Sequence, residues 1–285
     1  MSRDLPGTGS KICACGVSGI NGSPGFAAAA RQIAGQATLL HLAGKSLRGS
    51  CCWFFPDNCP KPEQGYIGGF SALEFASMKL DSQDLAQITT VTLGNYNAVA
   101  EGFREGTRDH DVSQNIHALL RNIRSVAPFQ ILDFGCGPGR DLRAFTAMGH
   151  IATGLDGSER FAEMARADSG CEVLHQNFLE LDLPAERFDG IFANASLFHV
   201  PRQELPRVLR ELRAALKPDG VLFSSNPRGD NQEGWKGERY GSFHDLESWS
   251  ALLTDAGFVE VEHYYRPEGL PREQQPWLAS VWRRV

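Results

Sequence analysis

A glycine-rich turn that follows a short apolar segment constrains the fold of this chain more than any other feature. The segment 129–135, FQILDFG, is apolar and ends at Gly135, and two further glycines follow at Gly137 and Gly139. A short apolar run that ends in glycines is typical of a buried parallel strand. Glycines at this spacing let the main chain turn sharply and approach a ligand closely. We therefore expect a ligand site where this strand ends.

Strand-like and helical segments alternate along the chain after this turn. Helical spacing of apolar residues predicts helices, and short apolar runs predict strands between them. The helices are expected at 141–148, 161–168, 201–216 and 245–256, and the strands at 150–156, 171–176, 187–194 and 221–226. Strands separated by such helices require right-handed crossovers, which predicts a doubly wound α/β sheet with helices on both faces. The last two strands, 258–266 and 276–284, are joined by too few residues for a helical crossover, so they should run antiparallel, directly paired or with another strand between them.

The chain divides into two parts of different character near Met78. Residues 1–77 are rich in glycine and turn-forming residues and hold five of the seven cysteines, so we expect a weakly structured N-terminal extension. These cysteines lack paired C-x-x-C spacing, and no metal site is predicted. Residues 78–285 form the predicted domain, which begins with two amphipathic helices between 84 and 126, broken around 106–111.

Composition limits the classes of partner. The 28 basic and 34 acidic side chains give a net charge of -6, so the broad positive field that drives nucleic-acid binding is missing. There is no run of 18 apolar residues and no secretory signal pattern, so we expect a cytoplasmic protein without a membrane partner. The oligomeric state cannot be predicted from these features.

The spacing of the glycine turn separates two kinds of nucleotide site. A dinucleotide fingerprint, G-x-G-x-x-G, would place its third glycine at the position of Arg140, whereas this chain has G-x-G-x-G. Asp133 lies two residues before the first glycine. Asp156 ends the second predicted strand, where a carboxylate can accept hydrogen bonds from both hydroxyls of a ribose in either kind of site.

These features together resemble the class I S-adenosylmethionine-dependent methyltransferases over about residues 84–285. The resemblance rests on the glycine turn with Asp133, on Asp156, and on three further motifs: Asn177-Phe178, Phe188-Asp189-x-Ile191 and Leu216-Lys217-Pro218-x-Gly220. It implies a Rossmann-like, seven-stranded, mostly parallel sheet with an antiparallel last strand. It also implies that the cofactor S-adenosylmethionine binds over the first two strand ends.

The resemblance assigns cofactor-binding roles to individual residues. The methionine portion would lie along Gly135, Cys136, Gly137 and Gly139, with Asp133 facing its ammonium group and Tyr96 closing over it. Asp156 with Gly157 would hold the ribose, and Asn177 and Phe178 would lie beside the adenine. Asn194 would contact the region near the sulfonium. The family more often has an acid at the position of Asn177, but an amide can still engage the exocyclic amine.

Residues for the methyl acceptor must lie at the same edge of the sheet. His199 follows the fourth strand and is the first candidate for a proton acceptor, although a structural histidine fits the same position. The insertion 226–244 is too long for a simple connection, so we expect a substrate loop there. Candidate substrate-binding residues are His110, Arg228, Trp235 and Tyr240.

The sequence therefore predicts a methyltransferase acting on a small molecule at nitrogen, oxygen, sulfur or carbon. An RNA or protein methyltransferase is disfavoured by the charge balance, since residues 78–285 hold 22 basic and 30 acidic side chains. A scaffold that binds the cofactor without turnover and a nicotinamide oxidoreductase remain alternatives.

Overall fold

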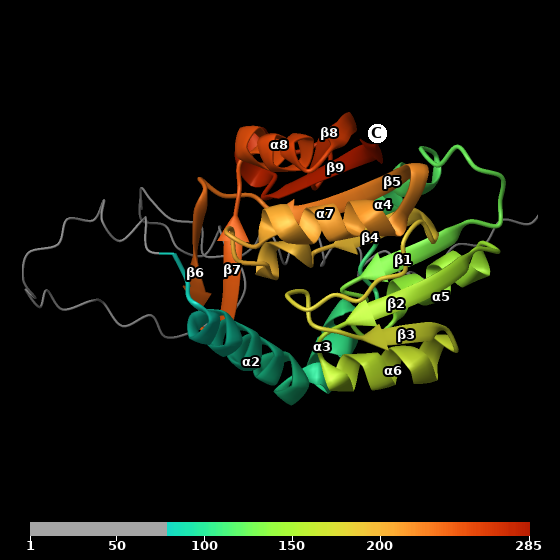
Figure 1. The fold of residues 1–285 in the computed structure, drawn as a ribbon. Helices are drawn as coiled ribbons and strands as arrows, with labels where there is room; N and C mark the ends of the chain where they lie inside the picture. The colour runs from blue at the N-terminus through green and yellow to red at the C-terminus, as the bar shows by residue number, and fades with distance from the viewer. Residues whose placement is uncertain (1–78) are drawn as a thin grey trace, which may run out of the picture. The chain divides into compact units, whose positions relative to one another are not determined.

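The computed structural model describes residues 79–285, whose core is one seven-stranded sheet flanked by helices (Figure 1). The strand order is β3-β2-β1-β4-β5-β9-β8. The strands are β1 (Gln130–Phe134), β2 (Ile151–Asp156), β3 (Glu172–His175), β4 (Phe188–Asn194), β5 (Leu216–Pro227), β8 (Phe258–Arg266) and β9 (Trp277–Arg284). The predicted extension 1–77, with its cysteines, lies outside the described residues.

The directions of the strands confirm the predicted fold class. Strand β1 pairs in parallel with β2 and β4, and β4 pairs in parallel with β5. Strand β9 lies between β5 and β8 and is antiparallel to both, so the last strand reverses direction and the final two strands pair directly. The carboxyl ends of β1, β2, β4 and β5 therefore meet at one edge, as binding sites in open α/β sheets require.

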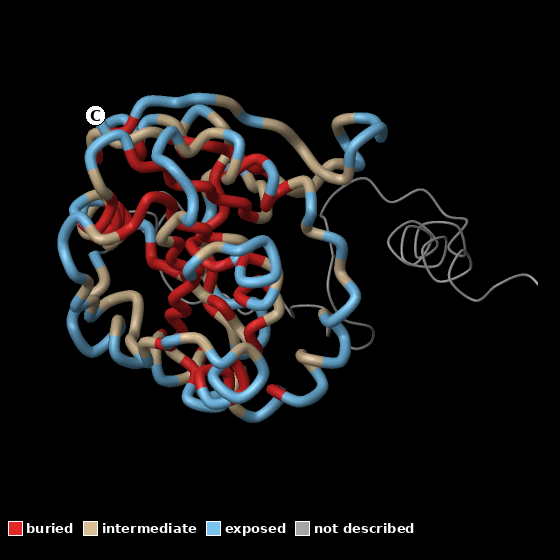
Figure 2. The backbone as a smooth tube through the Cα atoms, turned by 90° about the vertical axis from the view of Figure 1, so that its right-hand side faces the viewer, coloured by how far each residue is buried: buried red, intermediate tan, exposed pale blue. Residues whose placement is uncertain are grey.

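Helices cover both faces of the sheet. On one face α4 (Ser113–Leu120), α5 (Arg140–Ala147) and α6 (Glu159–Ser169) pack against Ile131 and its neighbours. On the other face α7 (Leu205–Ala215) and α8 (Leu246–Asp255) pack against Leu132 and Phe134. Because successive residues of β1 point to opposite faces, this strand is apolar on both, as predicted. Figure 2 shows the buried segments in the interior of the domain.

Two segments differ from the prediction. The structure has three helices where two were expected: α2 (Ser82–Ala98), α3 (Ala100–Thr107) and α4. The additional break is at Val99, whose φ of -105° and ψ of 12° are not helical. The expected substrate loop contains an antiparallel hairpin of β6 (Gln232–Lys236) and β7 (Arg239–Phe243). Short 3₁₀ turns form η3 (Leu197–His199) and η4 (Arg272–Gln274).

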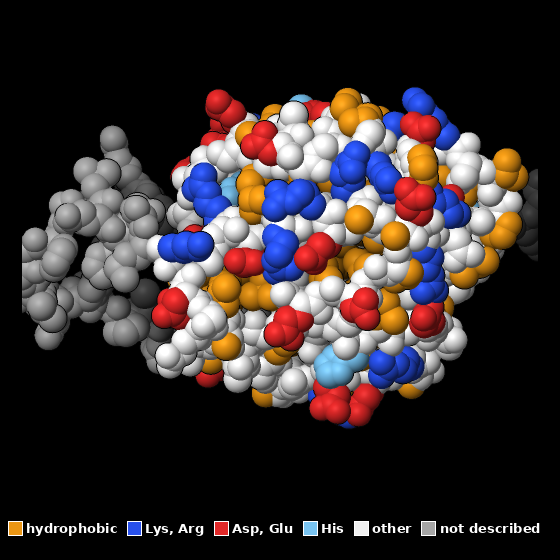
Figure 3. Space-filling view, viewed as in Figure 1, with side chains coloured by type: hydrophobic (Ala, Val, Ile, Leu, Met, Phe, Trp, Pro, Cys, Tyr) orange, Lys and Arg blue, Asp and Glu red, His pale blue; other side chains and the backbone are white. Residues whose placement is uncertain are grey.

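The surface of the domain mixes charges of both signs. Basic and acidic side chains are interspersed on the face that Figure 3 shows, with apolar atoms between them. Within residues 79–285, every helix is too short or too polar to cross a membrane.

Candidate active site

The glycine turn packs tightly against its surroundings at two positions. Gly135 and Gly139 have φ values of +81° and +91°, in the left-handed region that favours glycine. A Cβ on Gly139 would lie 2.8 Å from the Cα of Ala165 in α6, and one on Gly135 would lie 2.4 Å from the Cβ of Ser196. A Cβ on Gly137 would lie 3.9 Å from a ring carbon of Phe103, which is an ordinary contact distance. Glycine is therefore required at both ends of the turn for packing as well as for conformation.

We expect Gly139→Ala to destabilise the domain by about 2–4 kcal/mol, since it adds overpacking against α6 to the cost of a left-handed alanine. Gly149→Ala is a matched control, because Gly149 has a similar φ of +84° and a Cβ there would meet no atom of residues 79–285 within 4 Å. The control should cost only about 1–2 kcal/mol. Urea denaturation of both variants measures the difference, and equal midpoints would contradict the packing argument.

Asp156 joins the glycine turn to the start of α6. Its Oδ2 accepts a hydrogen bond from the main-chain N–H of Gly137 at 2.9 Å, and its Oδ1 accepts one from that of Ser158 at 2.8 Å. The side chain is buried at the carboxyl end of β2. Burial raises its pKa to about 6, although the hydrogen bonds to the main chain oppose this shift. Each carboxylate oxygen keeps a further lone pair for a ligand.

Asp133 is buried beside the same turn without a full set of partners. It is 2% exposed, and its Oδ2 has no hydrogen-bond partner among residues 79–285. Burial and the nearby Asp141 raise its pKa, and Arg140 opposes the shift. The guanidinium of Arg140 pairs instead with Asp141 at 2.6 Å and donates to the carbonyl of Thr107 at 3.0 Å. A buried, unpaired carboxylate oxygen is costly unless a ligand donates to it, so this atom marks a place for a cationic or N–H group.

The segment after β3 places an aromatic ring and an amide near the turn. The ring of Phe178 stacks on that of Phe134 with centroids 4.3 Å apart and lies 3.3 Å from the position of a Cβ on Gly135. The Oδ1 of Asn177 accepts from the N–H of Leu179 at 3.0 Å. This bond orients the side chain and leaves its NH₂ group as the available donor.

Three side chains from distant segments form a hydrogen-bonded chain that ends at Asn194. The hydroxyl of Tyr264 donates to Oδ1 of Asn115 at 2.9 Å, and Nδ2 of Asn115 donates to Oδ1 of Asn194 at 2.9 Å. Asn115 is fully buried. Since its amide is held from both sides, the orientation of the Asn194 amide is set, with its NH₂ group left to donate elsewhere.

Removal of the middle member should destabilise the domain. We expect Asn115→Ala to cost about 2–4 kcal/mol, because it leaves both the Tyr264 hydroxyl and Oδ1 of Asn194 without their partner and opens a cavity. Tyr264→Phe removes a single hydroxyl and should cost about 1 kcal/mol. Chemical denaturation measures both, and a smaller cost for Asn115→Ala than for Tyr264→Phe would contradict the chain.

Tyr96 and His199 form a hydrogen-bonded pair above the ends of the strands. The Tyr96 hydroxyl lies 2.7 Å from Nε2 of His199, and Nδ1 of His199 lies 2.7 Å from the carbonyl oxygen of Tyr240. A carbonyl only accepts, so Nδ1 carries the ring proton and Nε2 accepts from Tyr96. Burial lowers the pKa of His199 to about 4, and burial raises the pKa of Tyr96. Both groups are therefore neutral at pH 7.

Helices α2 and α3 and the hairpin cover the ends of the strands (Figure 1). Thr92 of α2 accepts from the N–H of Tyr240 in β7 at 3.1 Å, and Asn97 accepts from the Ser158 hydroxyl at the start of α6 at 2.7 Å. The side chain of Leu93 lies 3.0 Å from the position of a Cβ on Gly157. Helix α2 thus spans from the hairpin to the ribose side of the predicted site.

The remaining predicted residues lie in different places. The thiol of Cys136 packs in the core beside Gly154, and burial raises its pKa, so it is protonated at neutral pH. Tyr240 is buried and its ring meets that of Trp235, which is 45% exposed on β6. Arg228 directly follows β5 and donates to the carbonyl of Arg272 in η4 at 3.5 Å, and its Nε has no partner in the described part of the chain. His110 follows α3, and burial lowers its pKa.

The structure thus brings Tyr96, His199 and Tyr240 together, while His110 follows α3 and Arg228 contacts Arg272. Sequence reasoning missed Asn115, Tyr264, Thr92 and Asn97, which position the site residues. No local pattern marks these residues, because their partners are from 61 to 149 residues away in the chain.

Comparisons with known proteins agree with this geometry. Residues 131–220 match the family model of the methyltransferase domain. The chain is 32% identical over 184 residues to the malonyl-[acyl-carrier protein] O-methyltransferase of Erwinia pyrifoliae. This alignment covers 58% of this chain and 70% of the relative. The chain is also 32% identical over 163 residues to 24-methylenesterol C-methyltransferase 2 of Oryza sativa. This second alignment covers 52% of this chain and 42% of the relative. The chain thus spans less than half the length of this second relative.

Solved structures show the same fold. The 1,6-didemethyltoxoflavin-N1-methyltransferase of Burkholderia thailandensis, solved with 1,6-didemethyltoxoflavin and S-adenosylhomocysteine, has a TM-score of 0.59 at 23% identity, covering 73% of this chain and 92% of that chain. The [4+2]-cyclase SpnF has a TM-score of 0.54 at 17% identity, covering 69% of this chain and 96% of that chain.

The fold and the site define a class of Rossmann-like enzymes that use S-adenosylmethionine. This chain belongs to the S-adenosylmethionine-dependent methyltransferase family, as its motifs predicted. It is a methyltransferase, and S-adenosylmethionine is its cofactor.

Proposed function

We propose that this methyltransferase transfers a methyl group to a nitrogen, oxygen, sulfur or carbon atom of a small-molecule acceptor. The observation that carries the proposal is the cover over the strand ends, where Thr92 and Asn97 tie α2 to β7 and α6. A site enclosed in this way suits a compact acceptor better than a folded RNA or protein. The names of relatives support this, since they include methyltransferases of sterols and of ubiquinone biosynthesis.

The residues at the glycine turn fit the cofactor in charge and shape. S-adenosylmethionine, when bound, supplies an electrophilic methyl group on a cationic sulfur. The unpaired Oδ2 of Asp133 suits its ammonium group, and the lone pairs of Asp156 suit its ribose hydroxyls. Phe178 and the NH₂ group of Asn177 would hold the adenine, and the NH₂ group of Asn194 would donate near the methionine end.

Tyr96 and His199 would act together on an acceptor that arrives with a proton. As the acceptor proton moves to the oxygen of Tyr96, the Tyr96 proton moves to Nε2 of His199. With its pKa near 4, His199 cannot ionise the acceptor beforehand, so this transfer would accompany the attack on the methyl group. For an acceptor without a proton, the same pair would orient it, and alignment alone can supply roughly 7–11 kcal/mol.

The test is transfer of labelled methyl from S-adenosylmethionine into fractionated small molecules and, separately, into RNA and protein. We expect label in a small-molecule fraction. Label confined to RNA or protein would support the macromolecular alternative and contradict the proposal. Binding of S-adenosylhomocysteine with no transfer to any of the three pools would support a scaffold. Thermal shifts with S-adenosylhomocysteine and with NAD compare the cofactors directly.

The division of the chain is a further part of this proposal. Residues 78–285 would form the complete methyltransferase domain, and 1–77 an extension. A protein that starts at Met78 should then bind S-adenosylhomocysteine with the affinity of the full chain in calorimetry. An insoluble product or a large loss of affinity would assign residues 1–77 to the domain.

A further inference from the structure

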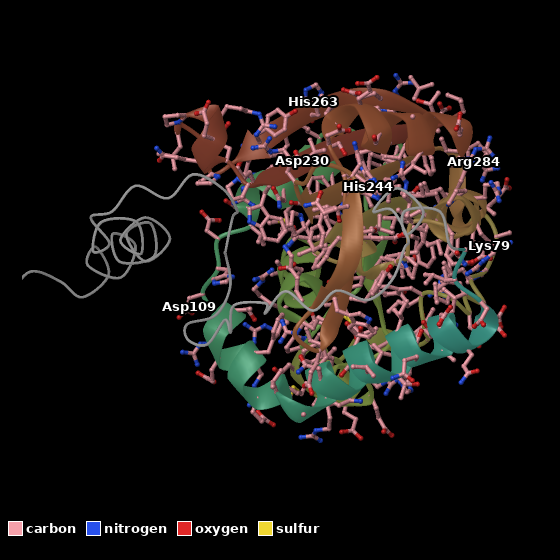
Figure 4. All side chains as sticks on the ribbon, turned by 90° about the vertical axis from the view of Figure 1, so that its left-hand side faces the viewer. Lys79, Asp109, Asp230, His244, His263 and Arg284 are labelled. Carbon is pink, nitrogen blue, oxygen red and sulfur yellow. The ribbon has the colours of Figure 1, made fainter. Side chains whose placement is uncertain are left out.

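Two successive residues of the hairpin bind one side chain of α2. The Oδ1 of Asn95 accepts a hydrogen bond from Nε of Arg239 at 2.7 Å, and Nδ2 of Asn95 donates to Oε2 of Glu238 at 2.9 Å. Figure 4 shows the hairpin extending from His244, which directly follows β7, to this helix. These contacts fix the position of Arg239 against α2.

The guanidinium of Arg239 lies against the Tyr96–His199 pair. Its Cζ is 4.4 Å from the centroid of the Tyr96 ring. Burial raises the pKa of Tyr96 and lowers that of His199, and the charge of Arg239 lowers both pKa values. Asp156 raises the pKa of Tyr96, but its effect is smaller than that of Arg239. Since a guanidinium stays protonated, a fixed positive charge lies beside the pair.

The other elements around Tyr96 leave this charge in place. From α3 and α6, the rings of Phe103 and Phe161 contact Tyr96 with centroids 5.7 and 5.6 Å away. Glu238 is exposed whereas Arg239 is half-buried, so water and salt screen the charge of Glu238 more strongly. Because both members of the pair are neutral at pH 7, the electrostatic potential beside them is positive.

The ring of Phe103 connects the pair to the glycine turn. It meets the Tyr96 ring edge to face, and it lies 3.9 Å from the position of a Cβ on Gly137. The side chains of Tyr96 and His199 are both partly exposed, so part of each remains accessible. An acceptor held between the turn and the pair would therefore lie near the charge of Arg239.

We propose that Arg239 selects methyl acceptors that react as an ionised oxygen or sulfur, such as a phenolate, a carboxylate or a thiolate. Its positive charge would stabilise the anion. An amine would be disfavoured, because its nitrogen becomes positive as it takes the methyl group. An ionised acceptor also places no proton on His199, whose charged form Arg239 repels. This inference rests on the proposed function and narrows its four acceptor atoms to oxygen and sulfur.

The transfer balances without a further reactant. The acceptor releases its proton to water when it ionises. Its oxygen or sulfur then forms a bond with the methyl carbon, and the electron pair of the broken carbon–sulfur bond stays on the sulfur of the cofactor. Arg239 takes no part in these bonds and acts through its charge.

The first test compares two probes of similar shape and opposite charge. The Kd values of 4-nitrophenolate and 4-nitrobenzylammonium would be measured with S-adenosylhomocysteine bound, at a pH where both probes are charged. We expect wild-type protein to bind the anion about 10-fold or more tightly than the cation. Arg239→Gln should remove most of this preference, whereas Arg239→Lys keeps the charge and should retain most of it. Equal affinity for the two probes, including binding of neither, would overturn the proposal, and so would an equal loss in Arg239→Lys.

Lys236→Gln is a matched control, because it removes a positive charge from the same hairpin. Lys236 is exposed, pairs with Arg239 across the turn, and has its Nζ 4.0 Å from the centroid of the Phe243 ring. This control should change the preference by less than about twofold. A loss as large as in Arg239→Gln would assign the preference to the overall charge of the hairpin and contradict a specific role of Arg239.

The absorbance of 4-nitrophenol gives a second measurement, because it follows the ionisation of the probe directly. With saturating wild-type protein and S-adenosylhomocysteine, we expect the probe to ionise about one pH unit lower than in water. An unchanged or higher midpoint would overturn the proposal. Both wild-type results decide the question even where a variant does not fold.

The labelled-methyl experiment separates this inference from the proposed function. Label confined to RNA or protein would defeat the proposed function, and the two probes still report on Arg239 in that case. Label on a nitrogen or carbon atom of a small molecule would leave the proposed function standing and overturn this inference. We expect the label on oxygen or sulfur.

Discussion

Asp156→Ala is expected to weaken binding of S-adenosylmethionine by about 10- to 100-fold. A hydrogen bond to a charged group contributes roughly 1.5–3 kcal/mol, and this substitution also leaves the main-chain N–H groups of Gly137 and Ser158 without their acceptor. The turn that faces the methionine portion is then less ordered. Calorimetric titration measures the change, and an unchanged affinity would remove Asp156 from the site.

The same carboxylate predicts a pH dependence of binding. Because the pKa of Asp156 is raised to about 6, the side chain is protonated below that pH and accepts hydrogen bonds less well. Affinity should therefore be highest above pH 7 and fall as the pH drops through 6, by at most about tenfold per pH unit. Asp156→Asn cannot titrate, so its weaker binding should vary less between pH 5 and 7. An equal slope in both proteins would assign the titration to another group, with Asp133 the first candidate.

Tyr96→Phe is expected to lower kcat by about 100-fold with an acceptor that carries a proton, near the lower end of the usual range for acid–base catalysis. We expect an effect on kcat near this lower end because the low pKa of His199 makes it a weak proton acceptor. The Kd of S-adenosylhomocysteine should change by less than about threefold, since the ring keeps its contacts with Phe103 and Phe161. Single-turnover transfer of labelled methyl isolates the chemical step.

Two further proteins control the Tyr96 experiment. Tyr265→Phe, on β8, should leave the rate unchanged. The double variant Tyr96→Phe/His199→Phe should be no slower than the slower single variant, because the two residues act as one unit. A double variant whose losses multiply would show that the residues act independently, and an unchanged kcat in Tyr96→Phe would exclude the relay.

Local patterns were sufficient for the fold of the domain. The apolar runs and glycine turns predicted the order of strands and helices, because burial on both faces of a sheet leaves a signal within a few residues. The break at Val99 was missed because that residue is neither glycine nor proline and is not part of any turn motif. The hairpin β6–β7 was missed because its strands are polar and exposed for most of β6, so their pairing leaves little alternation in the sequence.

Some features of the site could likewise be predicted from the sequence, and others could not. Asp133, Asp156 and the glycine turn could be predicted because they lie at or directly after the carboxyl ends of strands, and those ends must meet at one edge. Tyr96 and His199 were each singled out, but their hydrogen bond was not, since 103 residues separate them.

By itself, the sequence determined the class of fold and the position of the glycine turn, because these depend on periodicity and spacing along the chain. The cofactor was implied by the resemblance of its motifs to a known family. Only the tertiary structure decided that Asn115 holds Asn194 and that Tyr96 donates to a neutral His199. A hydrogen bond between distant segments forms only when its donor and acceptor atoms are placed to within a few tenths of an ångström. The packing of α2, α4 and the hairpin onto the sheet sets these positions. This packing cannot be predicted from residues that are neighbours in the chain.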